Sequence, residues 1–409
     1  MRGPLHVLTL EDAQKTLEKC WRPRADVKEV SLKEAGGRIL AMEVISKIDL
    51  PPFDRAAVDG YAVGAADTFG ADEDAPRRLL CVERISAGER PRLRLSKGRC
   101  AEIATGAPMP VGASAVVMVE YAVQRGDIVE VRRAVSPGEN VAKRGSEIRR
   151  GTKIFLAGPR LSPSAIGTLA AIGIGRVKVY MRPRIAVISS GAELAKVGMK
   201  LGYGQVYDTN GPAMCEAVKT CGGEPSYLGI APDEAPQIKM LVKRGLASCD
   251  AVIISGGSSA GAGDIAPSVV GGLGKPGVIV HGLAMKPGKP TFIAVVKGKP
   301  VFGLPGYPVS ALMIFDQLVA PYIRRMAGTR PLTRLTMRAK LGRKILSARG
   351  RRELVPVKLV KKGRELLAEP LMKGSGAITA LSMADGYIEV PLEQEIVDEG
   401  EVVEVVLLG

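Results

Sequence analysis

The feature that most limits how this chain can fold is an alternation of short apolar runs and helical segments between residues 179 and 328. One such run, Ala251 to Ile254, leads directly into a glycine-rich loop, and others lead into stretches with helical periodicity. This alternation is typical of a parallel sheet whose strands are joined by crossover helices. We therefore expect a three-layer α/β domain with a mostly parallel sheet in this region.

The segments on either side have different patterns, and 409 residues are too many for a single compact core. Short β-branched runs with turns predict a β-rich insert, and evenly spaced short strands in the tail predict a small β-barrel. The predicted domains are a small, elongated helical linker domain over 1–46 plus 143–178, the insert over 47–142, the central α/β domain over 179–328, and the C-terminal β-barrel over 329–409.

Three helix starts can be read from the sequence outside the central region. Thr9 and Ser31 each precede an acidic residue by three positions, which is the spacing of a capping box. Ser162 followed by Pro163 is a favourable pair for an N-cap and a first helical residue. We therefore expect the first 45 residues to be helical, with a further helix beginning at residue 163.

The charge balance and the cysteines limit the class of protein. With 58 Lys and Arg against 42 Asp and Glu, the net charge of +16 favours anionic ligands. Aromatic residues make up only 4%, so the stacking platforms of nucleic-acid binders are poorly supplied. The uncharged stretch 161–175 is too short and glycine-broken for a membrane span. The six cysteines form no CxxC pair and no secretory signal is recognised, so we expect a cytoplasmic, zinc-free protein that binds neither nucleic acid nor membrane.

The loop "SGGSSAGAGD", Ser255 to Asp264, has the chemistry of an anion cradle. Its glycines leave backbone amides uncovered and allow positive φ, so the loop can wrap closely around a ligand. Ligands of open parallel sheets bind beyond the carboxyl ends of the strands, where this loop lies. Its spacing matches neither common phosphate-binding motif, so a merely flexible connection remains an alternative.

Two further loops of the central region offer groups that bind anions. In "MKPGKP", Lys286 and Lys289 are held by prolines and a glycine, which suits a fixed polyanion, although a solvated basic turn would look the same. In "GLPGYPVSA", a Pro-Gly turn leads into a helix that begins with free N–H groups and the hydroxyl of Ser310. An ordinary helix start would need no ligand.

Carboxylates in the same loops predict a divalent cation. Glu193, Asp208 and Asp264 lie at the ends of predicted strands or before helices, and oxygen ligands without His or Cys favour Mg²⁺ bridging phosphates. Each could instead be a cap or a turn residue. Taken together, the acids, lysines and glycines favour a nucleotide-like or pyrophosphate site.

With these residues the chain resembles the molybdopterin molybdenumtransferase family, which includes the C-terminal domain of the scaffold protein gephyrin. The resemblance covers nearly the whole chain. The motifs that carry it are "PPFDRAAVDGYAV" at 51–63, "TGAPMP" at 105–110, "GAEL" at 191–194, "YDTN" at 207–210, the glycine loop, "MKPGKP", "GLPGYPVSA", "GRREL" at 350–354 and "GSGAITALSMADG" at 374–386.

The resemblance implies a transferase that inserts molybdate, or tungstate, into adenylylated molybdopterin, releases AMP and forms molybdenum cofactor with Mg²⁺ as cofactor. It also implies an elongated homodimer with its active site between subunits, and the molybdopterin adenylyltransferase and apo-molybdoenzymes as partners. A molybdopterin adenylyltransferase or a non-catalytic pterin-binding scaffold are the alternatives. The adenylyltransferase lacks the insert and tail of this chain.

Residue by residue, the resemblance assigns roles to the motif positions. The catalytic residues are Asp264, Asp59, Glu193 and Thr105, and the metal ligands are Asp264, Glu193 and Asp208. The substrate-binding residues are Gly256, Gly257, Ser258, Gly261, Asp208, Lys286, Lys289, Pro305, Pro308, Ser310, Arg144, Arg351 and Ser375. The chain departs from the family pattern at Val58, at Glu147 in place of Asp, at Tyr307 in place of Asn, and in the glycine loop, which lacks the usual valine.

Overall fold

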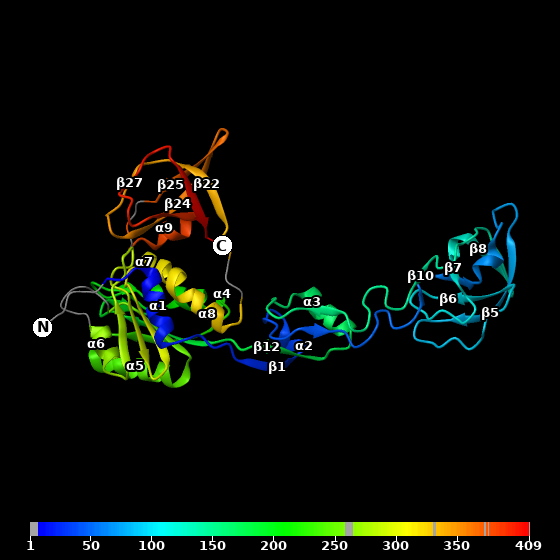
Figure 1. The fold of residues 1–409 in the computed structure, drawn as a ribbon, viewed down its shortest axis with the longest axis horizontal. Coiled ribbons are helices and arrows are strands. Elements are labelled where there is room, and N and C mark those ends of the chain that lie inside the picture. The colour runs from blue at the N-terminus through cyan, green and yellow to red at the C-terminus, as the bar shows by residue number, and fades with distance from the viewer. Residues whose placement is uncertain (1–6, 258–264, 330–332, 372–373, 375, 409) are drawn as a thin grey trace. The chain divides into compact units, whose positions relative to one another are not determined.

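The computed structural model describes residues 7–257, 265–329, 333–371, 374 and 376–408 (Figure 1). Its internal contacts divide the chain into two compact units. The larger unit contains Met1–Lys28 and Tyr180–Gly409, and the smaller unit contains Glu29–Val179.

The smaller unit contains the predicted β-rich insert, a six-stranded sheet in the order β7-β4-β6-β5-β9-β8. Tyr61 and Val63 face one apolar core while Ala62 between them faces another, so the sheet is buried on both sides. Two further short strands, β3 (Arg55–Ala56) and β10 (Val141–Ala142), pair beside it. The strands of the sheet are β4 (Gly60–Val63), β5 (Arg77–Ile85), β6 (Arg99–Ile103), β7 (Ala115–Met118), β8 (Ala122–Arg125) and β9 (Ile128–Val131).

The rest of the smaller unit packs around helix α3 (Pro163–Ala171). The hydroxyl of Ser162 accepts a hydrogen bond from the backbone N–H of Ala165 at 3.1 Å, so the predicted N-cap is confirmed. Leu169 of α3 is fully buried in the local core. The short elements around it are α2 (Leu32–Ala35), β2 (Val44–Ile45), β11 (Lys153–Phe155) and, at the ends of the unit, β1 (Val27–Ser31) and β12 (Arg176–Tyr180).

The expectation that the first 45 residues are helical is wrong for its second half. Residues 27–31 form strand β1, and α2 is a single turn. The hydroxyl of Ser31 donates to the Glu34 carboxylate at 3.3 Å and caps no backbone N–H. Two glycines follow the turn, and Gly37 has φ +71°, which ends the helix.

The larger unit is built on a six-stranded sheet in the order β16-β13-β17-β21-β20-β18. The first four strands are parallel and the last two are antiparallel, so the mostly parallel sheet is confirmed. The strands are β13 (Arg184–Ser190), β16 (Glu224–Ala231), β17 (Ala251–Ser255), β18 (Pro276–His281), β20 (Phe292–Val296) and β21 (Lys299–Leu304).

Helices cover both faces of this sheet and give it three layers (Figure 1). Val187 and Ile253 belong to the core that includes α1, α4, α7 and α8, whereas Ile188 and Ile254 pack against α5 and α6. The helices are α1 (Leu10–Cys20), α4 (Asn210–Thr220), α5 (Ala235–Ser248), α6 (Ile265–Gly271), α7 (Pro308–Ile314), a π-helical turn (Phe315–Val319) and α8 (Ala320–Met326).

Helix α1 begins as predicted but belongs to the larger unit. The hydroxyl of Thr9 accepts a hydrogen bond from the backbone N–H of Asp12 at 3.1 Å. Leu10 and Leu17 are buried in the core of the central sheet. The four-domain division stays a prediction, and α1 packs with the central sheet rather than with the linker segment of that division.

The tail forms the predicted β-barrel. Strands β24-β25-β22-β28-β26 follow one another, and a further pairing of β24 with β26 closes the ring around a core that includes Val357 and Val405. Among the described residues, no helix is long and apolar enough to cross a membrane. The elements of the tail are β22 (Thr336–Leu341), β23 (Ile345–Leu346), β24 (Arg352–Lys362), β25 (Glu365–Pro370), α9 (Ile378–Met383), β26 (Gly386–Val390), β27 (Ile396–Val397) and β28 (Val402–Leu407).

Candidate functional site

A cavity of about 600 Å³ lies in the larger unit between the loop 285–290, the start of α7 and the first residues of β24. It brings together residues that are far apart in the sequence, and much of its wall is apolar. The predicted site residues that line it are Lys286, Lys289, Pro305, Ser310 and Arg351. Pro308 is the first residue of α7, and Ser310, two positions later, is buried.

The cavity forms because a strand of the central domain joins the barrel. Strand β19 (Met285–Lys286) pairs in parallel with the start of β24, with Lys286 opposite Glu353. The ammonium of Lys286 lies 2.9 Å from Oε1 of Glu353. The Glu353 side chain is only 12% exposed, and its second oxygen, Oε2, is buried without a hydrogen-bond partner among the residues that the structure describes.

The loop after β19 holds Lys289 tightly against the fold. The backbone carbonyl of Lys289 accepts a hydrogen bond from the N–H of Leu283 at 3.1 Å. Gly288 has φ +130°, and a Cβ at this position would overlap the side chain of Ile314 in α7. Lys289 is half-buried, and within the described part of the chain neither its ammonium nor the guanidinium of Arg351 makes an ion pair. The cavity therefore offers two cations that the described residues leave uncompensated.

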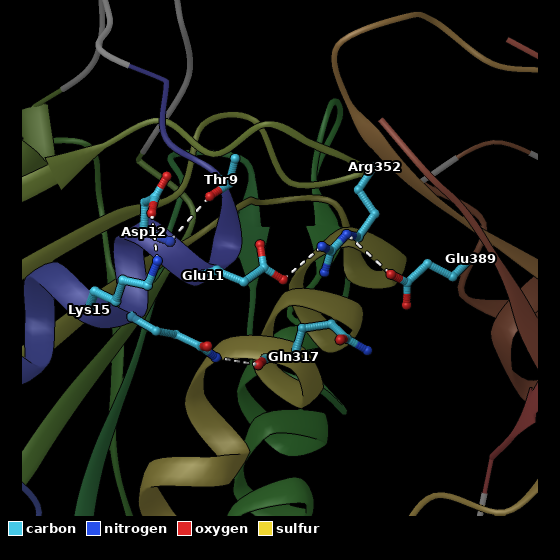
Figure 2. Close-up of polar contacts among 8 residues, drawn as sticks. Thr9, Glu11, Asp12, Lys15, Gln317, Arg352 and Glu389 are labelled. Atoms are coloured by element: carbon cyan, nitrogen blue, oxygen red, sulfur yellow. Dashed lines mark hydrogen bonds and ion pairs between the residues drawn. The ribbon is translucent and has the colours of Figure 1, made fainter. Parts of the chain in front are cut away.

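Arg352 fixes the strand that carries Arg351 and Glu353. Its guanidinium donates to the Glu11 carboxylate of α1 at 2.7 Å and lies 3.1 Å from the Glu389 carboxylate of β26 (Figure 2). Side chains alternate along a strand, so Arg352 points away from the cavity that its two neighbours line. Burial alone would raise the pKa of Glu11, but a backbone hydrogen bond and the Arg352 guanidinium lower it.

The other loops of the central sheet meet at its carboxyl edge. The side-chain amide of Asn210, at the start of α4, donates to the hydroxyl of Ser255 at 2.8 Å and to the carbonyl of Gly306 at 2.7 Å. The Ser255 hydroxyl donates in turn to the carbonyl of Pro305 at 3.1 Å. One amide thus ties together the loops that follow β15 (Val206–Tyr207), β17 and β21.

The start of the glycine loop has the backbone that the sequence predicts. Gly256 and Gly257 follow β17 with φ +96° and +66°. A Cβ on Gly256 would overlap the carbonyl oxygen of Ser190, so no other residue fits there. The predicted site residues Ser258, Gly261 and Asp264 of this loop lie outside the described residues, as does Ser375.

The structure separates the two acids of the central domain by their surroundings. Asp208 is 2% exposed and accepts hydrogen bonds from the hydroxyls of Ser189 and Tyr227 and from the backbone N–H of Gly211. Its environment is that of a residue that holds the start of α4. Burial and the neighbouring Asp208 raise the pKa of Tyr227, which keeps this phenol a donor.

Glu193, by contrast, is exposed, and its carboxylate lies over Gly191. Within the described ranges no group of three or more His, Cys, Asp or Glu side chains could hold a metal ion. The metal assignment of Glu193, Asp208 and Asp264 therefore stays a prediction.

The remaining predicted residues lie in the smaller unit. A carboxylate oxygen of Asp59 accepts hydrogen bonds from the backbone N–H of Thr105 at 2.7 Å and from its hydroxyl at 2.9 Å. These two bonds lower the pKa of Asp59. The guanidinium of Arg144 lies 2.6 Å from the Asp49 carboxylate, so it already has an anionic partner. Of the departures, Glu147 and Tyr307 are both exposed.

Sequence reasoning missed Arg352, Glu353 and Asn210 as contributors to this region. The first two lie inside the motif "GRREL", but the pairing of β19 with β24 joins residues too far apart to be inferred from periodicity. Asn210 lies inside "YDTN", two positions after Asp208, which sequence reasoning selected instead.

Three family models match successive parts of the chain: the MoeA N-terminal region (domain I and II) over residues 8–173, a probable molybdopterin binding domain over 186–325, and the MoeA C-terminal region (domain IV) over 338–408. The chain is 35% identical over 393 residues to a putative molybdopterin biosynthesis protein of Methanocaldococcus jannaschii, covering 93% of this chain and 92% of that protein. It is 36% identical over 328 residues to molybdopterin molybdenumtransferase 2 of Mycobacterium tuberculosis, covering 79% and 81% of the two chains. A crystal structure of the molybdopterin biosynthesis MoeA protein from Pyrococcus horikoshii superimposes with a TM-score of 0.84 at 42% identity, covering 98% of this chain and 99% of that chain.

Proposed function

Since the chain belongs to the MoeA family of molybdopterin molybdenumtransferases, we propose that it inserts molybdate, or tungstate, into adenylylated molybdopterin and releases AMP. Its role is that of a transferase in molybdenum cofactor biosynthesis. The proposal concerns the substrates, the cofactor and the residues that act on them.

The observation that carries the proposal is the cationic cavity beside β19. Lys286, Lys289 and Arg351 line it, and the last two make no ion pair among the described residues. A partly buried charge that no described carboxylate neutralises favours an anion as its ligand. A tetrahedral oxyanion accepts hydrogen bonds from several directions at once, which suits two ammonium groups and a planar guanidinium. We assign the oxyanion to this cavity.

The acids of the central domain then divide into two roles. The oxygens of Asp208 already accept hydrogen bonds from three residues, so Asp208 does not fit the ligand set of Mg²⁺. The exposed carboxylate of Glu193 fits the oxygen ligands that Mg²⁺ prefers, and we propose it as a ligand together with Asp264. When bound, Mg²⁺ supplies positive charge that neutralises the pyrophosphate. Asp208 instead orients the start of α4, whose Asn210 holds the loops around the site.

Asp59 and Thr105 form a preorganised pair in the smaller unit. We propose that they face the central domain of a second copy, so that the active site lies between subunits. The surface around β14 (Leu194–Ala195) and β15 exposes Val197, Met199 and Val206, which are 67%, 62% and 52% exposed. Exposed apolar side chains on one surface are typical of interaction sites, and we propose that these three take part in a homodimer interface. Met199→Glu should convert the protein to a monomer in light scattering, and an unchanged mass would contradict this interface.

The proposed partners and compartment follow from the substrates. The molybdopterin adenylyltransferase would supply the adenylylated pterin, and apo-molybdoenzymes would receive the finished cofactor. All six cysteines are free thiols, which agrees with a reducing, cytoplasmic compartment. The high net positive charge would steer the anionic reactants to the site, an effect that added salt should weaken.

Reconstitution tests the function directly. Purified protein with adenylylated molybdopterin, Mg²⁺ and molybdate should produce a cofactor that activates an apo-molybdoenzyme, and omitting Mg²⁺ should stop AMP release. No activation at any molybdate concentration would contradict the proposal. Consumption of ATP with non-adenylylated pterin would instead identify an adenylyltransferase, and pterin binding without turnover would identify a scaffold.

A further inference from the structure

The oxyanion cavity contains one group whose charge opposes its proposed ligand. Of its described lining residues, three are cations and one, Glu353, is a carboxylate. Glu353 lies beside Lys286, with Oε1 at 2.9 Å from the ammonium. An anion held by Lys286 therefore has a second negative charge close to it.

The surroundings of Glu353 are costly for the fold. Its side chain is only 12% exposed, and Oε2 is buried without any hydrogen-bond partner in the described structure. A carboxylate oxygen removed from water and left unpaired loses its hydration without compensation. A neutral glutamine could hold Lys286 through its amide oxygen at a smaller desolvation cost. Orienting Lys286 therefore does not by itself account for a carboxylate at this position.

We propose that Glu353 sets the affinity of the oxyanion site by electrostatic opposition, so that the anion is held by Lys286 yet stays weakly enough bound to be transferred. This inference rests on the proposed function, because it takes the cavity as the oxyanion site. An ammonium has three N–H donors, so Lys286 can donate to Glu353 and to an anion at once. Tight binding of the oxyanion before it reacts would raise the barrier to transferring its metal to the pterin. The negative charge of Glu353 would lower this barrier by weakening the binding of the oxyanion.

The size of the effect follows from the geometry. An anion hydrogen-bonded to the Lys286 ammonium lies about 3 Å from it, on the order of 6 Å from the Glu353 carboxylate. Even with the full screening of water, removing that one negative charge should tighten binding of a dianion at least about tenfold and of a monoanion at least about threefold. The factor for the dianion should equal the square of the factor for the monoanion, because a Coulomb energy is proportional to the ligand's own charge.

Glu353→Gln provides the test, with molybdate as the dianion and perrhenate as a monoanion of the same tetrahedral shape. Calorimetric titration at fixed ionic strength should show tighter binding of both anions to the variant, with the squared relation between the two factors. Glu365→Gln is the matched control, since it also removes a carboxylate paired with a lysine, Lys340, but lies outside the cavity lining. It should leave both affinities unchanged.

The outcomes separate this inference from the proposed function. If the wild-type protein binds molybdate and Glu353→Gln binds it equally or more weakly, the opposing role of Glu353 is wrong while the oxyanion site stands. Equal tightening of molybdate and perrhenate would also refute it, because a change in cavity shape, not charge, would then be at work. If the wild-type protein binds no molybdate, the assignment of the oxyanion site is wrong, and the proposed role of Glu353 is wrong with it. Glu353→Asp keeps the charge, and its affinity for both anions should stay close to that of the wild type.

Discussion

Replacing Arg352 by Gln should weaken both the fold and the oxyanion site, although Arg352 does not line the cavity. The side chain is 19% exposed and joins Glu11 of α1 to Glu389 of β26, so it connects three elements around the start of β24. Without it, the strand that carries Arg351 and Glu353 loses its anchor on the opposite face. Arg352 is thus a positioning residue, and its effect on the anion is indirect.

The magnitude follows from the exposure of the partners. Glu11 and Glu389 are 49% and 39% exposed, so each ion pair is partly screened and contributes about 0.2–1 kcal/mol. Loss of the largely buried arginine stem adds a packing term, for a total of about 1–3 kcal/mol in the free energy of unfolding. We expect the dissociation constant for molybdate to rise roughly threefold to tenfold, which corresponds to about 0.7–1.4 kcal/mol.

Urea unfolding and calorimetric titration with molybdate measure the two effects. Arg325→Gln is the matched control, because among the described residues Arg325 pairs with one half-exposed carboxylate, Glu18, at 2.6 Å, and Arg325 does not line the cavity. The control should lose less than about 1 kcal/mol and keep its molybdate affinity. Arg352→Lys should recover part of the affinity. If Arg352→Gln behaves like the control in both assays, the positioning role is refuted.

Three further changes test separate parts of the structure. Gly256→Ala should destabilise the protein by about 2–4 kcal/mol, because the new Cβ would overlap the carbonyl oxygen of Ser190. Gly198→Ala is the control, since Gly198 has φ +87° in open space and its replacement should cost about 1 kcal/mol. Equal unfolding midpoints for the two variants would contradict this prediction. Asp208→Asn should lower the free energy of unfolding in urea by about 2–4 kcal/mol, because the new amide N–H groups would face hydrogen-bond donors. The Mg²⁺ concentration needed for AMP release should stay unchanged. A large rise in that concentration would show that Asp208 is a metal ligand. Thr105→Val should raise the pKa of Asp59, read from its carboxyl chemical shift, because one of the hydrogen bonds that lower this pKa is lost. Because the pKa of Asp59 is lower in the folded protein, the Asp59–Thr105 contact stabilises the fold at pH values above the usual Asp pKa of about 3.9. This stabilisation is lost as the pH falls through the folded-state pKa. An unchanged titration of Asp59 in Thr105→Val would contradict this assignment.

Local signals in the sequence predicted the elements whose causes are local. Thr9 and Ser162 cap helices because each hydroxyl needs only a backbone N–H three residues away. The central sheet could be predicted from the sequence because its strands are continuous apolar runs, as strands buried on both faces are. Ser31 shows the limit of such signals: its spacing to Glu34 is that of a capping box, but the two glycines that follow allow only one turn of helix.

The motifs of the sequence led to residues that the structure brings together. The lysines of "MKPGKP" and Arg351 line one cavity, and their role in binding an anion stays a prediction. The surroundings of Asp208 and Glu353 were not predictable. Whether an acid is a ligand, a helix cap or an opposing charge depends on which donors the folded chain brings to it, and those donors come from other strands.

A crystal of the protein soaked with tungstate would test the central claim most directly, because tungsten is located by its anomalous scattering. The account predicts a tungsten peak inside the cavity beside β19, within hydrogen-bonding distance of Lys289 and Arg351. A peak bound elsewhere, with this cavity empty at saturating tungstate, would contradict the assignment of the oxyanion site.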